Sequence, residues 1–264
     1  MRTFVVGDVH GRRAQLARLL DALPRDEAAD TLVFLGDLID RGPDAPGVVA
    51  DVLELRRAAN PGRVVVLRGN HEQMMLDFVD EDSRLWLSNV TGGEQTFQQY
   101  TGGPLRVEAE EDFERARRLL EESVPEEHLE FIRGLPLYHE DDYALYVHAG
   151  LDHGKHPRDT DAHQLLWTRD SDFYKKYRGK PCVFGHTPTA FLPLLGRLGR
   201  HGIYISHSAI GIDTGYNYNS PLTCLSLPDF TLHQSFADGQ LVTHHITNFI
   251  PEELRAMKKA AGGA

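Results

Sequence analysis

Short apolar runs alternate with helix-like segments through the first part of the chain. Three of these runs have the length and composition of buried strands: Thr3–Val6, Thr31–Leu35 and Val64–Leu67. The segment Arg12–Leu23 places leucines at helical spacing, and apolar residues between 48 and 53 repeat that pattern before the third run. Strands and helices in regular alternation predict a parallel sheet with crossover helices, which makes this an α/β fold.

The pattern changes at about residue 76 and changes back at about residue 136. Between these positions, aromatic residues and leucines at helical intervals punctuate an acidic sequence, which predicts a helical insertion beside the sheet. Strand-like runs then return, and their turn residues predict a second, more antiparallel sheet. These runs are Ala144–Val147, Cys182–Phe184, Ile203–Ile205 and Thr223–Leu227, and a last helix is expected over Pro251–Ala264.

The composition is that of a globular chain rather than a fibrous or disordered one. Its 264 residues are 41% apolar and 25% charged, with no internal repeat or linker, and we expect residues 1–264 to form a single domain. Two cysteines cannot build a disulfide framework and suit a reducing cytoplasm. The lack of a long apolar run argues against a membrane span, and the net charge of −11 argues against nucleic acid as a partner.

More than half of the excess negative charge lies in one stretch of the insertion. Residues 108–127 hold nine acidic side chains and three arginines, a net charge of −6. Because the insertion leaves the sheet just after a polar strand end, we expect this stretch to flank the mouth of a site there. A negative rim would attract basic partners and repel acidic ones. An equally open alternative is a solvated helix face that only aids solubility.

Residues that can bind metal stand directly after five of the predicted strands, each beside a glycine. The five segments are Gly7–Gly11 (GDVHG), Gly36–Gly42 (GDLIDRG), Gly69–Glu72 (GNHE), His148–Gly150 (HAG) and Gly185–Thr187 (GHT). Ligands of open α/β sheets bind at the carboxyl ends of the strands. Carboxylate oxygens and imidazole nitrogens together suit first-row divalent metals such as Mn, Fe or Zn. Five such strand ends in one chain therefore predict a metal site.

Each polar residue also has a simpler interpretation when it is taken alone. Asp8 and Asp37 could cap the helices that follow them, because aspartate is a common N-cap. Arg41 and Arg169 could be surface ion-pair partners, and His71 could be a buried, hydrogen-bonded histidine. The repeated Gly-Asp context and the later histidines favour the metal site over these alternatives.

Taken together, the five segments resemble the motifs of the phosphoprotein phosphatase family of binuclear metallophosphoesterases, and they occur in the same order. The stretch 68–75 (RGNHEQMM) is similar to the bacterial and phage branch of that family, as are Leu166–Arg169 (LWTR) and Ile212–Gly215 (IDTG). The resemblance covers about residues 3–230. It implies two mixed β-sheets sandwiched between helices, the calcineurin-like metallophosphoesterase fold, with the helical insertion at about residues 76–136.

The resemblance also implies a set of ligands for two divalent metal ions. Asp8 and His10 would hold the first ion, and Asp37 would bridge both ions through its two oxygens. The second ion would be completed by Asn70, His148 and His186. The resemblance makes Mn the expected metal, with Fe, Zn or Ni as alternatives.

The remaining polar residues of the motifs are assigned by the same resemblance to the phosphate and the leaving group. Arg41 and Arg169 would bind phosphate oxygens, because a guanidinium fork matches two of them at once. His71 would protonate the leaving oxygen during in-line attack by a metal-bridging hydroxide. Asp40 would hold the ring of His71 and raise its basicity.

These assignments imply a phosphomonoester hydrolase of the serine/threonine protein phosphatase type, with phosphotyrosine and small aryl phosphates as further substrates to test. The expected partner is thus a phosphorylated protein or a small phosphomonoester. The alternative is a dinucleoside polyphosphate hydrolase, but those enzymes typically lack the residue found here at Asp40 and have aspartate in place of Glu72. A third interpretation, a non-catalytic scaffold on the same fold, would require eroded ligand positions, and every expected position is filled.

Overall fold

The computed structural model of the chain describes residues 1–264 except 105–106, 153, 199–201, 216–218, 253 and 255–264. Within the described residues, six strands form a first sheet in the order β11-β10-β9-β1-β2-β3. They are β1 (Thr3–Val6), β2 (Thr31–Phe34), β3 (Val64–Val66), β9 (Leu222–Leu227), β10 (Thr231–Ser235) and β11 (Leu241–His245). The strands β1, β2 and β3 are parallel, as predicted, whereas β9, β10 and β11 join β1 in antiparallel pairs.

Five further strands form the second sheet in the order β4-β5-β6-β8-β7, again within the described residues. They are β4 (Tyr138–Glu140), β5 (Leu145–Val147), β6 (Cys182–Phe184), β7 (Tyr204–Ser206) and β8 (Ala209–Gly211). Its central pairs, β5 with β6 and β6 with β8, are parallel, and its two outer pairs are antiparallel. The expectation of a second, more antiparallel sheet is therefore wrong, because the crossover through α7 (Ala162–Trp167) and α8 (Ser171–Lys176) carries the chain from β5 to β6 in the same direction.

One predicted strand belongs to a different sheet from the one expected. The run at Thr223–Leu227 forms most of β9, which pairs with β1 in the first sheet. The pairing places residues more than two hundred positions apart opposite one another, such as Thr3 and Leu227. Local pattern identifies such a run as a strand without indicating its neighbours. Most of the tail at 251–264, where a helix is expected, lies outside the described residues.

The helices cover the outer faces of the sheets and form the insertion. Those over the first sheet are α1 (Arg13–Ala22) and α2 (Ala45–Ala58), and those over the second are α7 (Ala162–Trp167) and α8 (Ser171–Lys176). The insertion contains α3 (Asn70–Asp80), the short 3-10 helix η1 (Leu85–Leu87), α4 (Gly93–Thr101), α5 (Glu110–Ser123) and α6 (Glu126–Arg133). Two further 3-10 turns are η2 (Pro157–Asp159) and η3 (Thr189–Phe191). The predicted helical insertion is thus present.

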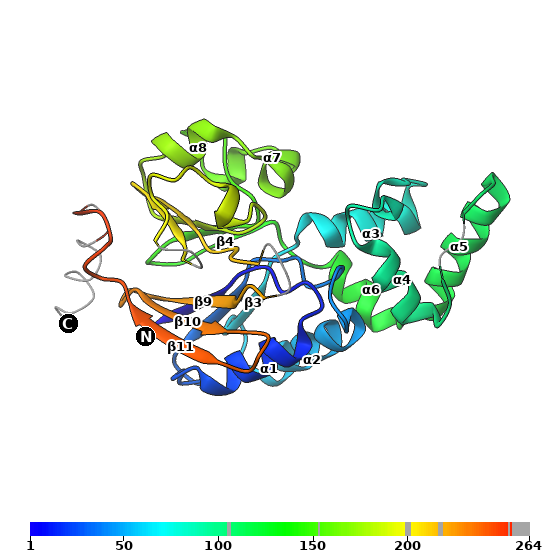
Figure 1. The fold of residues 1–264 in the computed structure, drawn as a ribbon, viewed down its shortest axis with the longest axis horizontal. Helices are drawn as coiled ribbons and strands as arrows, with labels where there is room; N and C mark the ends of the chain where they lie inside the picture. Colours follow the sequence, from blue (N-terminus) through cyan, green and yellow to red (C-terminus); the bar gives the residue numbers. More distant parts are fainter. Residues whose placement is uncertain (105–106, 153, 199–201, 216–218, 253, 255–264) are drawn as a thin grey trace.

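Alternate residues of each strand enter different cores, which produces the layers. In β1, Val5 lies in the core between the sheets, while Phe4 and Val6 pack with the helices beneath the first sheet. Successive side chains of a strand point to opposite faces, so one strand serves both cores. On the outer face of the second sheet, Phe184 packs against Phe173 of α8. Figure 1 shows the result, with α1 and α2 under the first sheet and α7 and α8 over the second.

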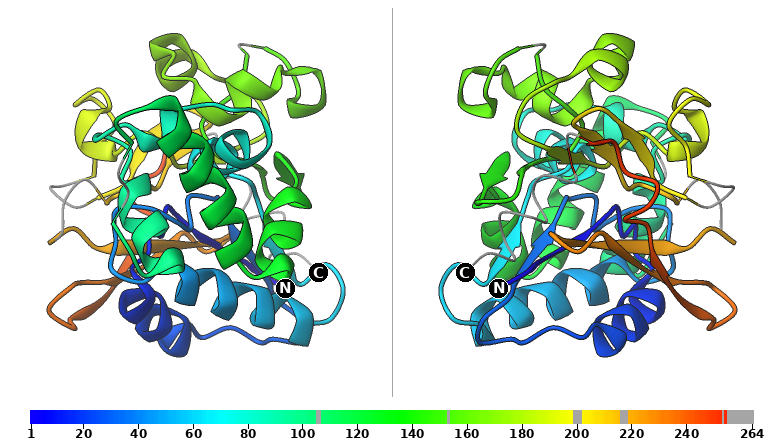
Figure 2. Two further views of the ribbon diagram at one scale, coloured as in Figure 1. Left: turned by 90° about the vertical axis from the view of Figure 1, so that its right-hand side faces the viewer. Right: turned by 90° about the vertical axis from the view of Figure 1, so that its left-hand side faces the viewer.

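The insertion projects from one side of the sheets. In Figure 1, α5 lies farthest from the two sheets, and α3, α4 and α6 lie in the space that separates α5 from them. Figure 2 shows the insertion helices in front when the molecule is viewed from that side. Helix α5 packs against α3 and α4 through a buried apolar stripe that includes Phe113 and Leu120. Among the described residues, no helix has both the length and the apolar character needed to cross a bilayer.

Candidate metal centre

Loops at the carboxyl ends of five strands bring most of the predicted site residues together. The loop after β1 carries Asp8 and His10, the loop after β2 carries Asp37, Asp40 and Arg41, the start of α3 carries Asn70 and His71, and the loops after β5 and β6 carry His148 and His186. All of these side chains are buried except Arg41, which is exposed like Arg169. The arrangement is a buried polar cluster with two arginines at its surface.

The backbone of these loops turns sharply at several site residues. Left-handed φ angles occur at His10 (46°), Asp37 (51°), Asp40 (70°), Arg41 (66°) and His186 (61°). Such conformations cost a non-glycine residue about 1–3 kcal/mol each and persist only where surrounding contacts hold them. Because these conformations are concentrated in one place, we infer that contacts in the rest of the fold offset their cost and hold these side chains in their orientations.

Two groups of potential metal ligands share one carboxylate. The first group consists of His10, Asp37 and His71, and the second consists of Asp37, His148 and His186. Within each group, the ligand atoms lie within 4.8 Å of one another. Asp37 faces both groups with different oxygens. Its Oδ2 lies 3.6 Å from Nε2 of His10, and its Oδ1 lies 3.4 Å from Nε2 of His148. This is the geometry that a carboxylate bridging two cations requires.

The hydrogen bonds of the histidines indicate that these groups fit cations. Nδ1 of His148 donates to the carbonyl of Leu35 at 2.9 Å, which orients the ring, and burial lowers the pKa of this histidine. Its Nε2 faces Oδ1 of Asn70 at 2.8 Å and Oδ1 of Asp37 at 3.4 Å. An imidazole nitrogen and two oxygens that converge in this way form a set of ligands that first-row divalent metals accept. His10 repeats the pattern, with Nδ1 bonded to a backbone carbonyl and Nε2 turned to Asp37.

Asp8 lies next to this cluster with an excess of negative charge around it. Its carboxylate accepts the backbone N–H of His186 at 3.0 and 3.2 Å. Burial, followed by the charges of Asp213 and Asp37, raises the pKa of Asp8 well above its usual value. Buried carboxylates this close together are stabilised when cations lie among them. Asp213 also accepts the backbone N–H of Gly215 at 2.9 Å.

His71 belongs to a second network that begins at the same loop. Its Nδ1 lies 2.6 Å from Oδ2 of Asp40, and its Nε2 lies 3.2 Å from a terminal nitrogen of Arg41. Burial lowers the pKa of His71, but the charges of Asp37 and Asp40 raise it by more, so the pKa lies above its ordinary value. A histidine of this kind can hold a proton at neutral pH and donate it to a leaving group.

Arg169 is the one predicted site residue that comes from outside the five strand-end loops. It stands between α7 and α8, and its Nε donates to Nε2 of His186 at 3.4 Å. Arg41 contacts the cluster at His71 and Arg169 contacts it at His186, so the two exposed guanidinium groups approach it at different histidines.

The simpler interpretations of the aspartates do not hold. Helix α1 begins after Arg12 and α2 begins after Asp44, so Asp8 and Asp37 cap neither helix. Glu72 instead stabilises the loop that carries Asp37. Its carboxylate accepts the backbone N–H groups of Asp37, Leu38 and Gly69 at 2.7 to 2.8 Å.

Two buried side chains of the insertion bind Asp40 and were not expected there. Trp86 donates its indole N–H to both oxygens of Asp40, at 3.1 and 3.0 Å, and the hydroxyl of Thr96 donates to Oδ1 of Asp40 at 2.7 Å. All three side chains are fully buried. In the sequence, Trp86 is only one of the aromatic residues that indicate a helical core, and no motif distinguishes Thr96.

The acidic stretch lies elsewhere than expected. It forms α5 and the start of α6, and Figure 1 shows α5 at the outer end of the insertion, on the far side of α3 and α4 from the sheets. The expectation that this stretch flanks the mouth of the site is therefore wrong. An apolar stripe that packs on α3 and α4 places α5 there, and its glutamates face solvent.

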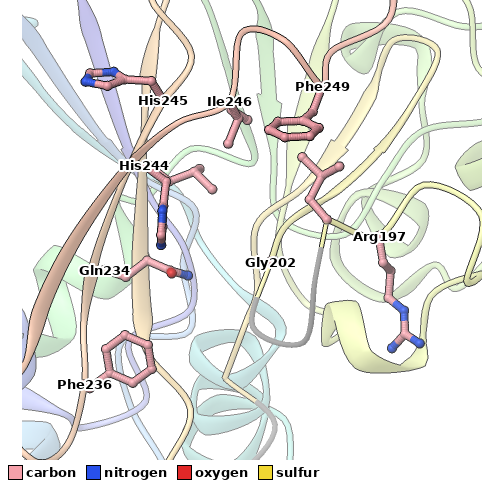
Figure 3. A pocket seen from close by; sticks show the side chains of 10 residues that line it. Arg197, Gly202, Gln234, Phe236, His244, His245, Ile246 and Phe249 are labelled. Carbon is pink, nitrogen blue, oxygen red and sulfur yellow. The ribbon is translucent and has the colours of Figure 1, made fainter.

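A separate cavity of about 640 Å³ lies at the edge of the first sheet formed by β10 and β11. Leu232, Gln234 and His244 are among the residues that line it, and Figure 3 shows the guanidinium of Arg197 pointing away from the other labelled side chains. Among the described residues, the lining includes none of the predicted site residues and no carboxylate. The described part of the cavity therefore offers no carboxylate to a metal ion.

Comparison with known proteins agrees with the motifs. The sequence model of the calcineurin-like phosphoesterase family matches residues 1–209. The chain is 32% identical over 189 residues to serine/threonine-protein phosphatase 1 of Salmonella typhimurium, which is 70% of this chain and 78% of that protein. It is 30% identical over 151 residues to a symmetrical bis(5'-nucleosyl)-tetraphosphatase of Methylococcus capsulatus, which is 57% of this chain and 44% of that protein. The chain thus spans less than half the length of the second relative.

Solved structures share the fold at low sequence identity. A protein described as a candidate diadenosine tetraphosphatase superposes with a TM-score of 0.60 at 22% identity, over 92% of each chain. A cold-active protein-tyrosine phosphatase of a Shewanella species superposes with a TM-score of 0.53 at 18% identity, over 92% of this chain and 80% of that one. Two mixed sheets between helices, as expected from the sequence, are thus confirmed as the fold.

Proposed function

The chain belongs to the calcineurin-like phosphoesterase family and is a metallophosphoesterase, and on that premise we propose that it hydrolyses phosphomonoesters as a serine/threonine-type protein phosphatase. The observation that carries the proposal is the 2.6 Å contact between His71 and Asp40 beside two ligand groups that share Asp37. A leaving alkoxide needs a proton donor, and this pair supplies one next to the site of attack.

We assign the ligands of two divalent cations to the cluster. Asp8, His10 and Asp37 would hold one cation, and Asp37, Asn70, His148 and His186 would hold the other. Mn is the first metal to test, with Fe, Zn and Ni as alternatives, because all of them accept mixed oxygen and imidazole ligands. When bound, such a pair activates the attacking water and neutralises charge on the phosphoryl group.

The chain's own residues would bind the substrate and move the proton. Arg41 and Arg169, exposed above the buried cluster, would each bind phosphate oxygens through their guanidinium N–H groups. As the phosphorus–oxygen bond to the leaving group breaks, Nε2 of His71 would donate its proton to that oxygen. Asp40, at Nδ1 of the same ring, keeps the imidazolium oriented and stabilises its charge.

A second candidate is hydrolysis of a dinucleoside polyphosphate, and the relatives with that name support it. Anhydride cleavage releases a phosphate leaving group, which needs little protonation at neutral pH. A buried pair of His71 and Asp40 would therefore contribute less to that reaction than to the release of an alkoxide. The pair thus favours the phosphomonoester, and the two reactions can be separated by experiment.

The test is a kinetic panel on metal-depleted enzyme. Each substrate is assayed after the enzyme is resupplied with Mn, Fe, Zn, Ni or Mg. The substrates are phosphoserine, phosphothreonine and phosphotyrosine peptides, p-nitrophenyl phosphate and diadenosine tetraphosphate. We expect no turnover without metal, restoration by Mn and the highest kcat/KM for the phosphoserine or phosphothreonine peptides. A clear preference for diadenosine tetraphosphate would replace the proposal with the second candidate, and turnover in protein shown by elemental analysis to be metal-free would refute the metal assignment.

We also propose that the whole chain works as one domain in the cytoplasm without a nucleic-acid partner. The core between the sheets includes residues from Val5 to Leu254, which supports a single folding unit. The net charge of −11 supports the absence of a nucleic-acid partner, and two buried free cysteines suit a reducing compartment.

A further inference from the structure

The loop that carries Asp40 and Arg41 is held from one side by a segment of the insertion. We call residues 86–96, from η1 to the first turn of α4, the brace segment. Asp40 and Arg41 have consecutive left-handed φ angles of 70° and 66°, a conformation that needs outside contacts to persist. The brace segment makes such contacts with both residues.

Two buried side chains of the brace segment bind the carboxylate of Asp40. The hydroxyl of Thr96 donates to Oδ1 at 2.7 Å and accepts the backbone N–H of Asp40 at 2.9 Å, so one side chain holds both ends of the residue. The indole N–H of Trp86 lies 3.1 and 3.0 Å from the two oxygens. With His71 at Oδ2, three donors surround one fully buried carboxylate. Its orientation is therefore fixed by residues that do not belong to the loop.

The same segment contacts Arg41 through its backbone. The amide of Arg41 donates to the carbonyl of Gly92 at 3.4 Å, and its Nε donates to the carbonyl of Thr91 at the same distance. A side chain at Gly92 would meet the backbone nitrogen of Arg41 at 2.7 Å. Gly93 must likewise stay small, because a Cβ there would lie 2.3 Å from the carbonyl oxygen of Trp86. Close approach of the segment thus depends on two adjacent glycines.

We propose that Trp86 and Thr96 are positioning residues for catalysis, which hold Asp40 so that it aims the ring of His71 at the leaving group. The inference rests on the proposed role of His71 as the proton donor. Neither residue touches the substrate phosphate or supplies a metal ligand. The helical insertion then has a part in the reaction, since its inner edge completes a network that the strand-end loops leave open.

A purely structural role makes a different prediction from a positioning role. If Trp86 and Thr96 only stabilised the loop, their loss would lower the free energy of unfolding and affect the enzyme equally with or without His71. If they act through Asp40 and His71, their effect disappears once His71 is gone. Residues that act in one network show this kind of non-additivity in a double-mutant cycle.

The experiment compares Thr96→Val, which keeps the shape and removes both hydrogen bonds, with Thr96→Ser, which keeps the hydroxyl. We expect Thr96→Val to lower kcat for an alkyl phosphate roughly 10-fold or more, the size of loss usual for outer partners of metal-binding histidines, with KM and bound metal unchanged. Thr96→Ser should restore most of the loss. Trp86→Phe should also lower kcat, and it replaces Thr96→Val in the experiment if the valine variant does not fold. Thr101→Val is the matched control, because Thr101 lies in the same helix and its hydroxyl donates only to nearby carbonyls.

The cycle is completed by placing Thr96→Val in a His71→Asn background. No further loss of kcat is expected there, and an equal loss in both backgrounds would overturn the proposal. A readout without turnover is the downfield proton NMR signal of the His71 Nδ1–H in the Zn²⁺-loaded protein. It should be lost or shifted in Thr96→Val and unchanged in Thr101→Val, and an unchanged signal in Thr96→Val would also overturn the proposal. Because this signal needs no substrate, a chain that hydrolyses only dinucleoside polyphosphates would refute the proposed function without deciding this inference.

Discussion

Two regions reach the candidate site, and they contribute different kinds of interaction. The strand-end loops supply ionisable groups, carboxylates and imidazoles that include two groups of three whose ligand atoms lie within 4.8 Å of one another in each group. The inner edge of the insertion supplies neutral donors, the indole of Trp86 and the hydroxyl of Thr96, which bind Asp40. The outer edge of the insertion, α5, carries charge but lies beyond α3 and α4.

This difference separates three levels of expected effect. Changes in the ligand loops should alter metal content together with activity, because the atoms proposed to bind the metal ions are also the ones on which activity depends. Changes around His71 and Arg41 should alter kinetics with metal retained. Changes on α5 should alter neither, since the partners described for its charged side chains, such as Arg84 and Asp82, lie in the insertion.

Asp37→Asn should have the largest effect. Asparagine offers one oxygen and one amide nitrogen, so it cannot face both ligand groups with oxygens, and each group loses a charge. We expect activity to fall to background and bound metal per chain, measured by elemental analysis, to fall with it. Asp51→Asn is the control, because Asp51 is a half-exposed partner of Arg13 on the surface. Near-normal activity and metal content in Asp37→Asn would show that this carboxylate does not bridge.

His71→Asn should lower kcat by roughly 10²–10⁴-fold with metal content unchanged, which is the usual contribution of a general acid. The loss should be smaller for p-nitrophenyl phosphate than for an alkyl phosphate, because p-nitrophenolate leaves without much help from a proton. The measurement is kcat for both substrates. His244→Asn, an exposed position on β11, is the control. An equal loss for both substrates would point to a structural role for His71.

The ligand loops could be predicted from the sequence because each ligand stands beside a glycine at the end of an apolar run. Strand boundaries such as those of β1 and β6 were predicted for the same local reason. Trp86 and Thr96 could not be predicted, since their partner Asp40 lies 46 and 56 positions away. The strands β10 and β11 were also missed, because Thr231–Ser235 and Leu241–His245 contain polar residues and histidines and lack a clear apolar run. Contacts that depend on distant parts of the chain leave no local pattern.

Arg41→Ala should have an intermediate effect on the same reaction. Its exposed guanidinium is proposed to bind phosphate in both the ground state and the transition state, so KM should rise and kcat should fall. The rise in KM and the fall in kcat together should raise the activation free energy that corresponds to kcat/KM by about 1–3 kcal/mol, the usual range for a hydrogen bond to a charged group. Arg57→Ala removes an exposed arginine that pairs with Glu127 and serves as the control. Unchanged kinetics with every phosphomonoester would remove Arg41 from the substrate site.

The smallest effect is expected on α5. Glu110, Glu111, Glu121 and Glu122 are exposed on this helix, and α3 and α4 separate it from the sheets. Charges farther apart than about 10 Å are largely screened at 0.1 M salt, so replacing all four with glutamine should leave kcat/KM unchanged for basic and acidic phosphopeptides alike. The measurement is kcat/KM for a matched peptide pair with flanking lysines or glutamates, at low salt and at 0.1 M. A preference for the basic peptide that disappears in the variant would show that α5 steers substrates from a distance.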